Sequence, residues 1–150
     1  MDRRVKVLFV CIGNSCRSPM AEALARHGAA DVIEAASAGI VPLGVIQPST
    51  LQVLRERGVP CETQSSKGPD EIHRFQPDLI VNLSGYPGLS TFGHYEVEDW
   101  RVEDPYGDDL ETYRRICDDI AARVADLAVR LRAHSSRSPA AVERDSPART

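Results

Sequence analysis

The chain has 150 residues, with 18 Lys+Arg against 22 Asp+Glu, a formal net charge of -4 and 42% hydrophobic residues. This length suits one globular domain that can bury enough surface to fold without disulfides or a structural metal. The weak acidity argues against a basic face for nucleic acid and against docking on an anionic membrane. The longest apolar run, Val7 to Ile12, is far shorter than the roughly 18 residues that a membrane span needs. We therefore expect neither nucleic acid nor a membrane among the partners.

The cysteines and the first residues indicate a cytoplasmic protein. The basic start, residues 1–4, is too short for a secretory signal, and no small-residue cleavage site follows it. The cysteines form no Cys-x-x-Cys pair and have no metal-ligand spacing with the four histidines; they stand at positions 11, 16, 61 and 117. We expect free thiols, no metal and no cofactor.

Short apolar runs alternate with helical patterns in the first half of the chain. Val5–Val10 is an apolar, β-branched run typical of a buried parallel strand, and a turn from Cys11 to Arg17 follows it. Ser18 offers an N-cap oxygen and Pro19 suits a first helical position, so a helix is expected to begin at about Pro19. The next expected elements are a strand over 32–37, a helix over 51–57 capped by Gly58, and a short helix over 70–75.

The second half continues the alternation and ends in a polar segment. Residues 78–83 form a third buried run, and residues 94–100 a weaker fourth strand with imperfect alternation. From 110 to 131 apolar residues recur every three or four positions, which predicts a long amphipathic helix. We expect a domain over 1–133 and a disordered tail over 134–150, where almost nothing apolar is left to bury. Alternating strands and helices predict a doubly wound α/β fold, whose ligands bind beyond the carboxyl ends of the strands.

The turn from Cys11 to Ser18 lies at such a strand end. A helix N-terminus presents unpaired N–H groups and a positive dipole end, and Gly13 lets the preceding loop fold around a tetrahedral oxyanion. The same field favours the thiolate of Cys11, which makes this residue a candidate nucleophile. The planar guanidinium of Arg17 can hold two oxygens of the anion. This Cys-x5-Arg loop therefore predicts a site for phosphate or another tetrahedral oxyanion.

A bare Cys-x5-Arg motif is a weak signal, because the chain contains a second one from Cys117 to Arg123. That copy lies inside the long amphipathic helix and lacks glycine, so we expect Cys117 in the core.

Cleavage of a phosphate ester also needs an acid for the leaving group. Asp104, on an Asp-Pro-Tyr-Gly turn, is the candidate. The alternative is that Asp104 only starts the long helix, although Asp108 and Asp109 are also available as its cap.

The segment Val7–Glu22, together with Glu103–Gly107, resembles the low-molecular-weight protein tyrosine phosphatase family, over about residues 5–132. The resemblance implies a three-layer α/β fold, a doubly wound sheet of four parallel strands flanked by helices. It also implies a protein phosphatase that hydrolyses phosphotyrosine on proteins through a cysteinyl-phosphate intermediate. Cys11 would be the nucleophile, Arg17 would stabilise the transition state, and Asp104 would act as acid and then as base. No metal or cofactor is required.

The resemblance also assigns roles to other positions. The backbone from Ile12 to Arg17, with Gly13, Asn14, Ser15 and Cys16, would bind phosphate; Asn14 would hold the shape of the loop, and Ser18 would support the thiolate. Ser37 matches a serine that hydrogen-bonds to the loop asparagine, and Tyr106 matches an aromatic residue of the substrate cleft. Cys16 matches a second loop cysteine that forms a reversible disulfide with the nucleophile; simple loop packing is the alternative.

The departures from the family pattern leave the substrate open. Ser15, at a position that is apolar in many tyrosine-specific members, resembles the bacterial protein-arginine phosphatases, and Gly107 replaces a second cleft aromatic. The loop sequence from Asn14 to Ser18 also resembles that of the thioredoxin-coupled arsenate reductases of this fold. Those enzymes need two more cysteines after the third strand, and residues 82–92 contain none. An arsenate reductase that uses Cys11 and an external thiol is therefore an alternative. A binding module without turnover is disfavoured because all three candidate catalytic residues are present.

Overall fold

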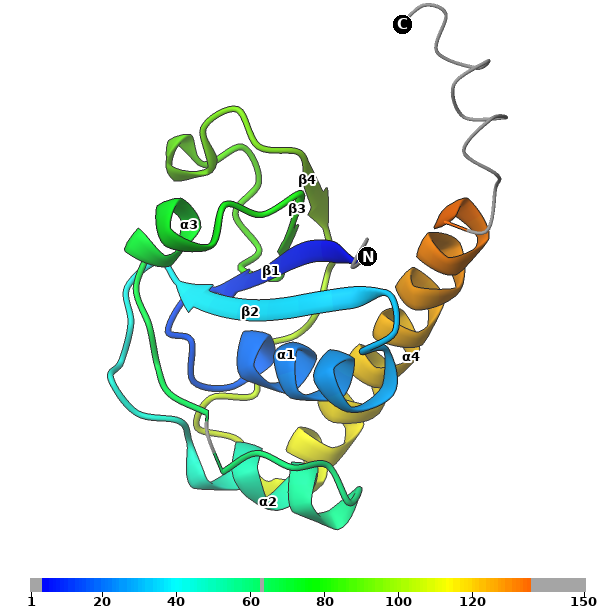
Figure 1. The fold of residues 1–150 in the computed structure, drawn as a ribbon. Helices are drawn as coiled ribbons and strands as arrows, with labels where there is room; N and C mark the ends of the chain where they lie inside the picture. Colours follow the sequence, from blue (N-terminus) through cyan, green and yellow to red (C-terminus); the bar gives the residue numbers. More distant parts are fainter. Residues whose placement is uncertain (1–3, 63, 136–150) are drawn as a thin grey trace, which may run out of the picture.

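Four parallel strands form the centre of the protein in a computed structural model, which describes residues 4–62 and 64–135 (Figure 1). The strands follow the order β2-β1-β3-β4 across the sheet. Their bounds are Val5–Cys11 for β1, Ile33–Gly39 for β2, Leu79–Asn82 for β3 and Val97–Asp99 for β4. The predicted sheet of four parallel strands flanked by helices is thus confirmed.

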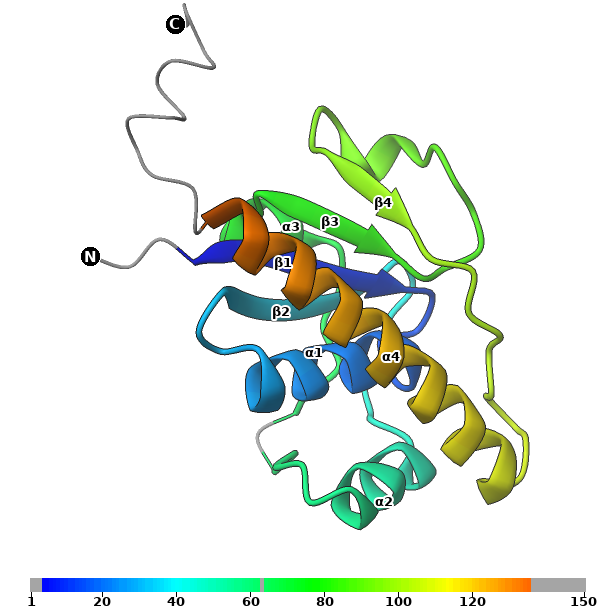
Figure 2. The same ribbon diagram turned by 90° about the vertical axis from the view of Figure 1, so that its right-hand side faces the viewer.

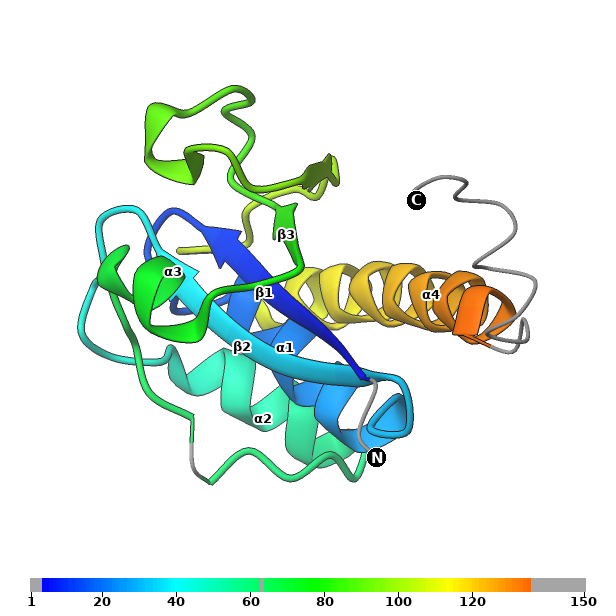
Figure 3. The same ribbon diagram turned by 45° about the horizontal axis from the view of Figure 1, so that its top comes forward.

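Helices cover both faces of this sheet and give three layers (Figures 2 and 3). One face carries α1 (Arg17–Gly28), α2 (Pro48–Glu56) and α4 (Leu110–Ser135). The other face carries α3 (Asp70–Phe75) and the 3-10 turn η1 (Ser90–Phe92). Within the described residues, no helix combines the length and the apolar character that crossing a membrane requires.

The central strand β1 explains why its sequence is apolar at nearly every position. Val7 and Phe9 belong to the core beneath α1 and α4, whereas Leu8 and Val10 belong to the core beneath α3 and η1. Side chains of a strand alternate between the two faces, so a strand covered on both sides is apolar throughout. Cys11 is the last residue of β1, which lies between β2 and β3 in the sheet, and it pairs with Gly39 of β2.

Several predicted boundaries are wrong by a few residues. Helix α1 begins at Arg17, not at Pro19, and Ser18 is not its N-cap. Pro19 is accommodated as the third helical residue because the first N–H groups of a helix have no partner within the helix. Helix α2 begins at Pro48, which occupies its first turn. The fourth strand is only three residues long, because the turn η1 and Gly93, at φ 56°, interrupt the extended chain before it.

Helix α4 runs to Ser135, so it includes the first two residues of the predicted tail. Its apolar stripe packs Tyr113, Ile120 and Leu127 into the core with α1, as the spacing predicted. The rest of the predicted tail, residues 136–150, lies outside the described residues.

Candidate active site

The loop between β1 and α1 is held in place through its own carbonyl groups. The carbonyls of residues 11, 12 and 13 accept hydrogen bonds from the N–H groups of residues 40, 41 and 43 at 3.0, 2.8 and 3.0 Å. The carbonyl of Ser15 accepts from the Gln47 N–H at 3.1 Å and from the Thr50 hydroxyl at 2.9 Å. In a planar trans peptide the C=O and the following N–H point in opposite directions. Carbonyls held away from the loop therefore turn the N–H groups of residues 12, 13, 14 and 16 toward its centre, where they form an anion nest.

Cys11 lies at the base of this nest, with only 2% of its surface exposed. The hydroxyl of Ser18 is 2.9 Å from Cys11 Sγ, and the Ser18 N–H donates to the same sulfur at 3.5 Å. Both groups belong to the first turn of α1, so the positive end of the helix dipole also faces the sulfur. The side chain of Ser18 therefore points to the site instead of capping the helix.

Asn14 provides the left-handed residue at which the loop turns. Its backbone is left-handed, at φ 49°, a conformation that its side-chain hydrogen bonds stabilise. Asn14 Nδ2 donates to Ser18 Oγ at 2.8 Å and to Ser37 Oγ at 3.0 Å, and Asn14 Oδ1 accepts from the Lys67 N–H at 2.7 Å. The structure thus brings Ser37 to Asn14, as the family resemblance implies. The backbone N–H of Lys67 carries no side-chain signal, so sequence reasoning missed it.

Arg17 is buried, with 5% of its surface exposed, and two carbonyls fix its guanidinium. Nη1 donates to the carbonyl of Leu83 at 2.7 Å and to that of Val102 at 3.2 Å. Nη2 lies 3.5 Å from Oδ2 of Asp104, and Nε is buried with no hydrogen-bond partner among the described residues. A buried donor without an acceptor is costly. The edge formed by Nε and Nη2 can bind two oxygens of a tetrahedral anion.

Asp104 reaches the site from the turn that precedes α4. Its Oδ1 accepts from the Tyr106 N–H at 3.1 Å, and Gly107, at φ 84°, provides the left-handed residue of the turn. The cap of α4 is Asp109, whose carboxylate accepts from the Thr112 N–H at 2.9 Å; this hydrogen bond lowers the pKa of Asp109. Asp104 is therefore not needed as a helix cap, and its side chain, 49% exposed, is free to face the pocket.

One pocket of about 250 Å³ joins these groups. Its lining includes Cys11, Arg17 and Asp104, with the predicted loop residues Ile12, Gly13, Ser15 and Cys16 and the predicted cleft residue Tyr106. Val41 and Leu43 also line it, and sequence reasoning assigned them no role. Together with Tyr106 they leave an exposed apolar rim around a polar base.

The other cysteines are free thiols in surroundings that keep them protonated. Cys16 is 3% exposed, with its sulfur 3.4 Å from the hydroxyl of Tyr113, and burial raises the pKa of the Cys16 thiol. Burial also raises the pKa of Cys117 to about 11, and this residue is in the core as predicted. Tyr113 had no signal in the sequence beyond its place on the apolar stripe of α4. In residues 4–62 and 64–135 no cluster of three or more His, Cys, Asp or Glu side chains could hold a metal ion.

Curated proteins that resemble this chain match it over nearly their whole length. An arsenate reductase of Bacillus cereus is 32% identical over 85% of this chain and 97% of its own length. A glutaredoxin arsenate reductase of Synechocystis is 32% identical over 84% of this chain and 98% of its own length.

Solved structures with the same fold include members with different activities. An arsenate reductase in the phosphate-binding state has a TM-score of 0.77 and 30% identity, over 85% of this chain and 98% of its own. A low molecular weight protein tyrosine phosphatase from T. tengcongensis has a TM-score of 0.73 and 29% identity, over 85% and 99%. An arginine phosphatase from Geobacillus stearothermophilus, at 23% identity and a TM-score of 0.75 over 89% and 98%, shares the fold. The sequence model of the low molecular weight phosphotyrosine protein phosphatases matches residues 6–87, and the chain belongs to this family.

Proposed function

We propose that this chain is a phosphatase that hydrolyses phosphotyrosine in proteins, with Cys11 as the nucleophile. The observation that carries the proposal is the convergence of the Cys11 sulfur, the Arg17 guanidinium and the Asp104 carboxylate on one pocket lined by an anion nest. A nucleophile, an anion clamp and an acid are the groups that this reaction needs. The arsenate reductase of the same fold in its phosphate-binding state supports oxyanion binding.

The reaction proceeds in two displacements. The Cys11 thiolate attacks phosphorus and forms an S–P bond, while the bond to the tyrosine oxygen breaks and Asp104 gives that oxygen its proton. The Asp104 carboxylate then takes a proton from water, whose oxygen attacks phosphorus, breaks the S–P bond and releases phosphate. The Nε–Nη2 edge of Arg17 and the N–H groups of the loop stabilise the equatorial oxygens in both steps.

The rim of the pocket supports an aromatic leaving group. Val41, Leu43 and Tyr106 are 65%, 49% and 55% exposed, which is unusual for large apolar side chains beside a polar site. A tyrosine ring that enters between them buries apolar surface while its phosphate reaches Cys11. This arrangement supports phosphotyrosine over the smaller phosphoserine.

Ser15 supports a second phosphatase substrate, phosphoarginine. The Ser15 side chain lines the pocket, next to the sulfur of Cys16 at 3.7 Å. A hydroxyl oxygen there can accept a hydrogen bond from the guanidinium of a phosphoarginine, whereas an apolar side chain cannot. The ratio between the two substrates then depends on Ser15.

Arsenate reduction is the remaining candidate, favoured by the names of the Bacillus cereus and Synechocystis relatives. Cys11 would displace hydroxide from arsenate and form an S–As bond. An external thiol would then attack the Cys11 sulfur, release arsenite and leave a mixed disulfide, which a second thiol reduces. The external thiol is required because residues 82–92 contain no cysteine. Ser84 in that segment is buried and donates its hydroxyl proton to Asn82 at 2.7 Å.

Parallel assays test the proposal. Phosphate release is measured from a phosphotyrosine peptide and from a phosphoarginine peptide under reducing conditions, with Cys11→Ser as the blank. We expect release from the phosphotyrosine peptide that depends on Cys11, and Ser15→Ile should lower any release from phosphoarginine more than from phosphotyrosine. No release from either peptide, together with arsenate-dependent consumption of a reduced thiol, would replace the phosphatase with an arsenate reductase.

A further inference from the structure

A second pocket lies beside the candidate site, and none of the steps above uses it. Its volume is about 450 Å³, and its walls are formed by residues within 82–87, after β3, and by residues 99–103, after β4. We call it the β4 pocket. In Figure 2 the strands β1, β3 and β4 point to the same side, and the segment after β4 runs past the end of β1 toward α4. The β4 pocket and Cys11 therefore lie at the same edge of the sheet.

The β4 pocket shares a wall with the candidate site. The carbonyls of Leu83 and Val102 both accept hydrogen bonds from Arg17, at 2.7 and 3.2 Å. Val102 and Glu103 line the β4 pocket, and the next residue, Asp104, lines the pocket of the candidate site. Adjacent Cα atoms are about 3.8 Å apart, and an extended peptide advances by about 3.3–3.6 Å per residue. A side chain within a few residues of a bound phosphotyrosine can therefore reach the β4 pocket.

Carboxylates dominate the charge around the β4 pocket. Residues 96–111 contain eight acidic residues and one basic residue, Arg101. Two of these carboxylates, those of Asp99 and Glu103, line the pocket together with Arg101. Glu103 pairs with Arg115 at 3.2 Å, whereas no cation forms an ion pair with Asp99 in the part of the chain that the structure describes. The β4 pocket therefore favours a positively charged ligand.

A buried amide holds the Asp99 carboxylate in the wall of the pocket. Asn82, 2% exposed, donates through Nδ2 to Oδ1 of Asp99 at 2.9 Å and to the carbonyl of Tyr86 at 3.1 Å. Asn82 Oδ1 accepts from the hydroxyl of Ser84 at 2.7 Å. The amide of Asn82 is thus fully used within the protein, and Oδ2 of Asp99 is left to accept from a ligand.

The rest of the wall suits the stem of a long cationic side chain. Trp100 is 5% exposed, and together with Pro87 and Val102 it gives the β4 pocket an apolar surface. Lysine and arginine lay their methylene groups along such a surface and keep the charged head at its polar border. A glutamate side chain would instead meet the carboxylates of Asp99 and Glu103.

Arg17 indicates the charge that lies next to this cation. Its Nε is buried without a hydrogen-bond partner among the described residues, and Arg17 lines the pocket of Cys11. A buried donor without an acceptor is costly, so this atom favours an anion in that pocket. The two adjacent pockets are therefore complementary to an anionic group and a cationic group that are a few residues apart.

We propose that the β4 pocket binds a lysine or arginine side chain that is close to the phosphotyrosine in the sequence of the substrate protein. The inference rests on the proposed function, because the phosphotyrosine positions this side chain. Asp99 provides the charge that recognises it, and Glu103 adds to the negative potential. The substrates are thus phosphotyrosines in basic segments of proteins.

The test uses phosphotyrosine peptides in which a single lysine is moved through the four positions on either side of the phosphotyrosine, with glutamine as the reference. We expect lysine to raise kcat/KM by about twofold to fivefold, the value of an exposed ion pair, at one or two adjacent positions. The gain should lie in KM, because the contact is the same in the ground state and the transition state. It should shrink at high salt, and glutamate at the same position should lower kcat/KM.

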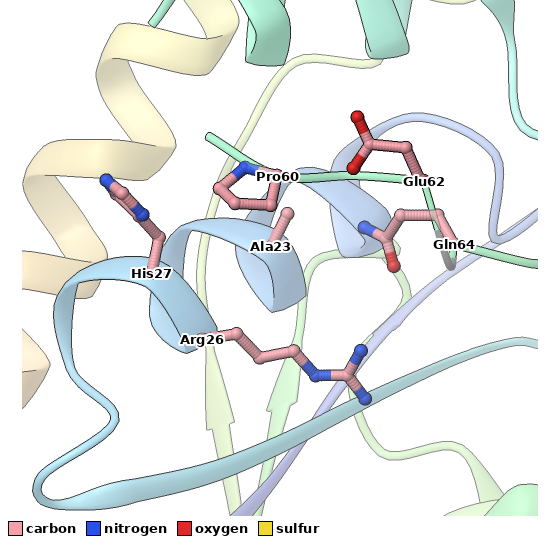
Figure 4. A pocket seen from close by; sticks show the side chains of 6 residues that line it. All are labelled: Ala23, Arg26, His27, Pro60, Glu62 and Gln64. Atoms are coloured by element: carbon pink, nitrogen blue, oxygen red, sulfur yellow. The ribbon is translucent and has the colours of Figure 1, made fainter. Parts of the chain in front are cut away.

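Asp99→Asn removes the charge and keeps an oxygen for Asn82, so it should reduce the gain from lysine to less than about 1.5-fold. Glu62→Gln is the matched control, with the same change in net charge in a different pocket, of about 320 Å³, on α1 (Figure 4). In Figure 4 the Glu62 carboxylate points away from Arg26, on the far side of that pocket. This control should retain the full gain. Should Asp99→Asn fail to fold, Glu103→Gln, at a side chain that is 57% exposed, is judged by the same criterion.

Three results would overturn the inference. An equal gain at all eight positions would show only a general attraction to an acidic surface. Faster hydrolysis of the glutamate peptide would make Arg101 the recognising charge, and a full gain in Asp99→Asn would remove Asp99 from recognition.

Binding of the lysine and glutamine peptides to Cys11→Ser, measured by calorimetry, separates this inference from the proposed function. If the wild type hydrolyses neither peptide, the phosphatase proposal fails. Tighter binding of the lysine peptide would then still support the β4 pocket, whereas equal affinities, or no binding of either peptide, would refute it as well.

Discussion

The contact between Gly39 and the loop leads to a prediction about how the anion nest is held. A Cβ atom on Gly39 would lie 2.7 Å from the Asn14 nitrogen, 2.8 Å from the Ile12 oxygen and 2.9 Å from Asn14 Cβ. Ordinary van der Waals contacts of a Cβ are 3.4–4 Å, so Gly39→Ala requires a displacement of about 0.5–1 Å. Gly39 pairs with Cys11 and donates to the carbonyl of Lys67 at 2.8 Å, which fixes the strand. The loop must therefore move.

The expected cost has two parts. A shift of up to 1 Å in the groups that position a substrate costs on the order of 100-fold in rate, so kcat/KM for an aryl phosphate should fall by about that factor. Overpacking lowers the free energy of unfolding by roughly 1–3 kcal/mol, and for this chain length each kcal/mol lowers Tm by about 2–4 °C. Inhibition by inorganic phosphate should weaken as well, because the nest is distorted.

The control is Gly28→Ala, at the end of α1, where a Cβ meets nothing within 4 Å. This variant should keep wild-type kinetics and a Tm that is unchanged or slightly higher. Steady-state kinetics, phosphate inhibition and thermal unfolding are measured on both variants. Wild-type kinetics and phosphate affinity in Gly39→Ala would show that the loop does not depend on this close approach.

Two further predictions concern the site, and a third concerns the core. Cys11→Ser should abolish turnover and still bind inorganic phosphate, seen by calorimetry; a loss of binding would place the sulfur in the binding contacts themselves. Asp104→Ala should slow the hydrolysis of aryl phosphates with poor leaving groups by roughly 10² to 10⁴, whereas Asp108→Ala should not, and the reverse result would move the acid to Asp108. The raised pKa of Cys117, about 11 against an ordinary 9.0, means that the folded state keeps a proton that the unfolded chain loses. Its stabilising effect is complete below pH 9 and is lost as the pH rises to about 11, so the Tm of Cys117→Ala should fall less steeply over that range than the wild-type Tm.

The fold was predictable where local patterns were strong. The run that became β1 is covered by helices on both faces, and the stripe that became α4 follows a regular period, so both appear in the sequence. Strand β4 appears there only as a weak pattern over 94–100, because Val97 and Glu98 are half-buried and Asp99 is exposed. It is defined by backbone pairing with β3, which leaves no pattern of side chains.

The candidate site was also predictable only in part, namely where its residues are contiguous in the sequence. Residues 11–18 are contiguous, and the chemistry of a strand, a Gly-containing turn and a helix start can be read from them directly. The groups that orient them arrive from elsewhere as backbone atoms, such as the carbonyls of Leu83 and Val102 on Arg17. Sequence analysis assigned no role to Glu22, because its spacing of four from Arg26 is typical of an exposed helical ion pair. Only the fold shows that Glu22 is buried.

The central claim is that Cys11 carries a phosphoryl group during turnover, and one measurement tests it directly. In Asp104→Ala the first displacement from p-nitrophenyl phosphate needs no acid, because the leaving phenolate is stable, whereas the second lacks its base. The intermediate should therefore accumulate. Rapid quenching followed by mass spectrometry should find one phosphoryl group on the peptide that contains Cys11, and none in the variant that also carries Cys11→Ser. An unmodified Cys11 during continuing release of nitrophenolate, or a phosphoryl group on another residue, would contradict the account.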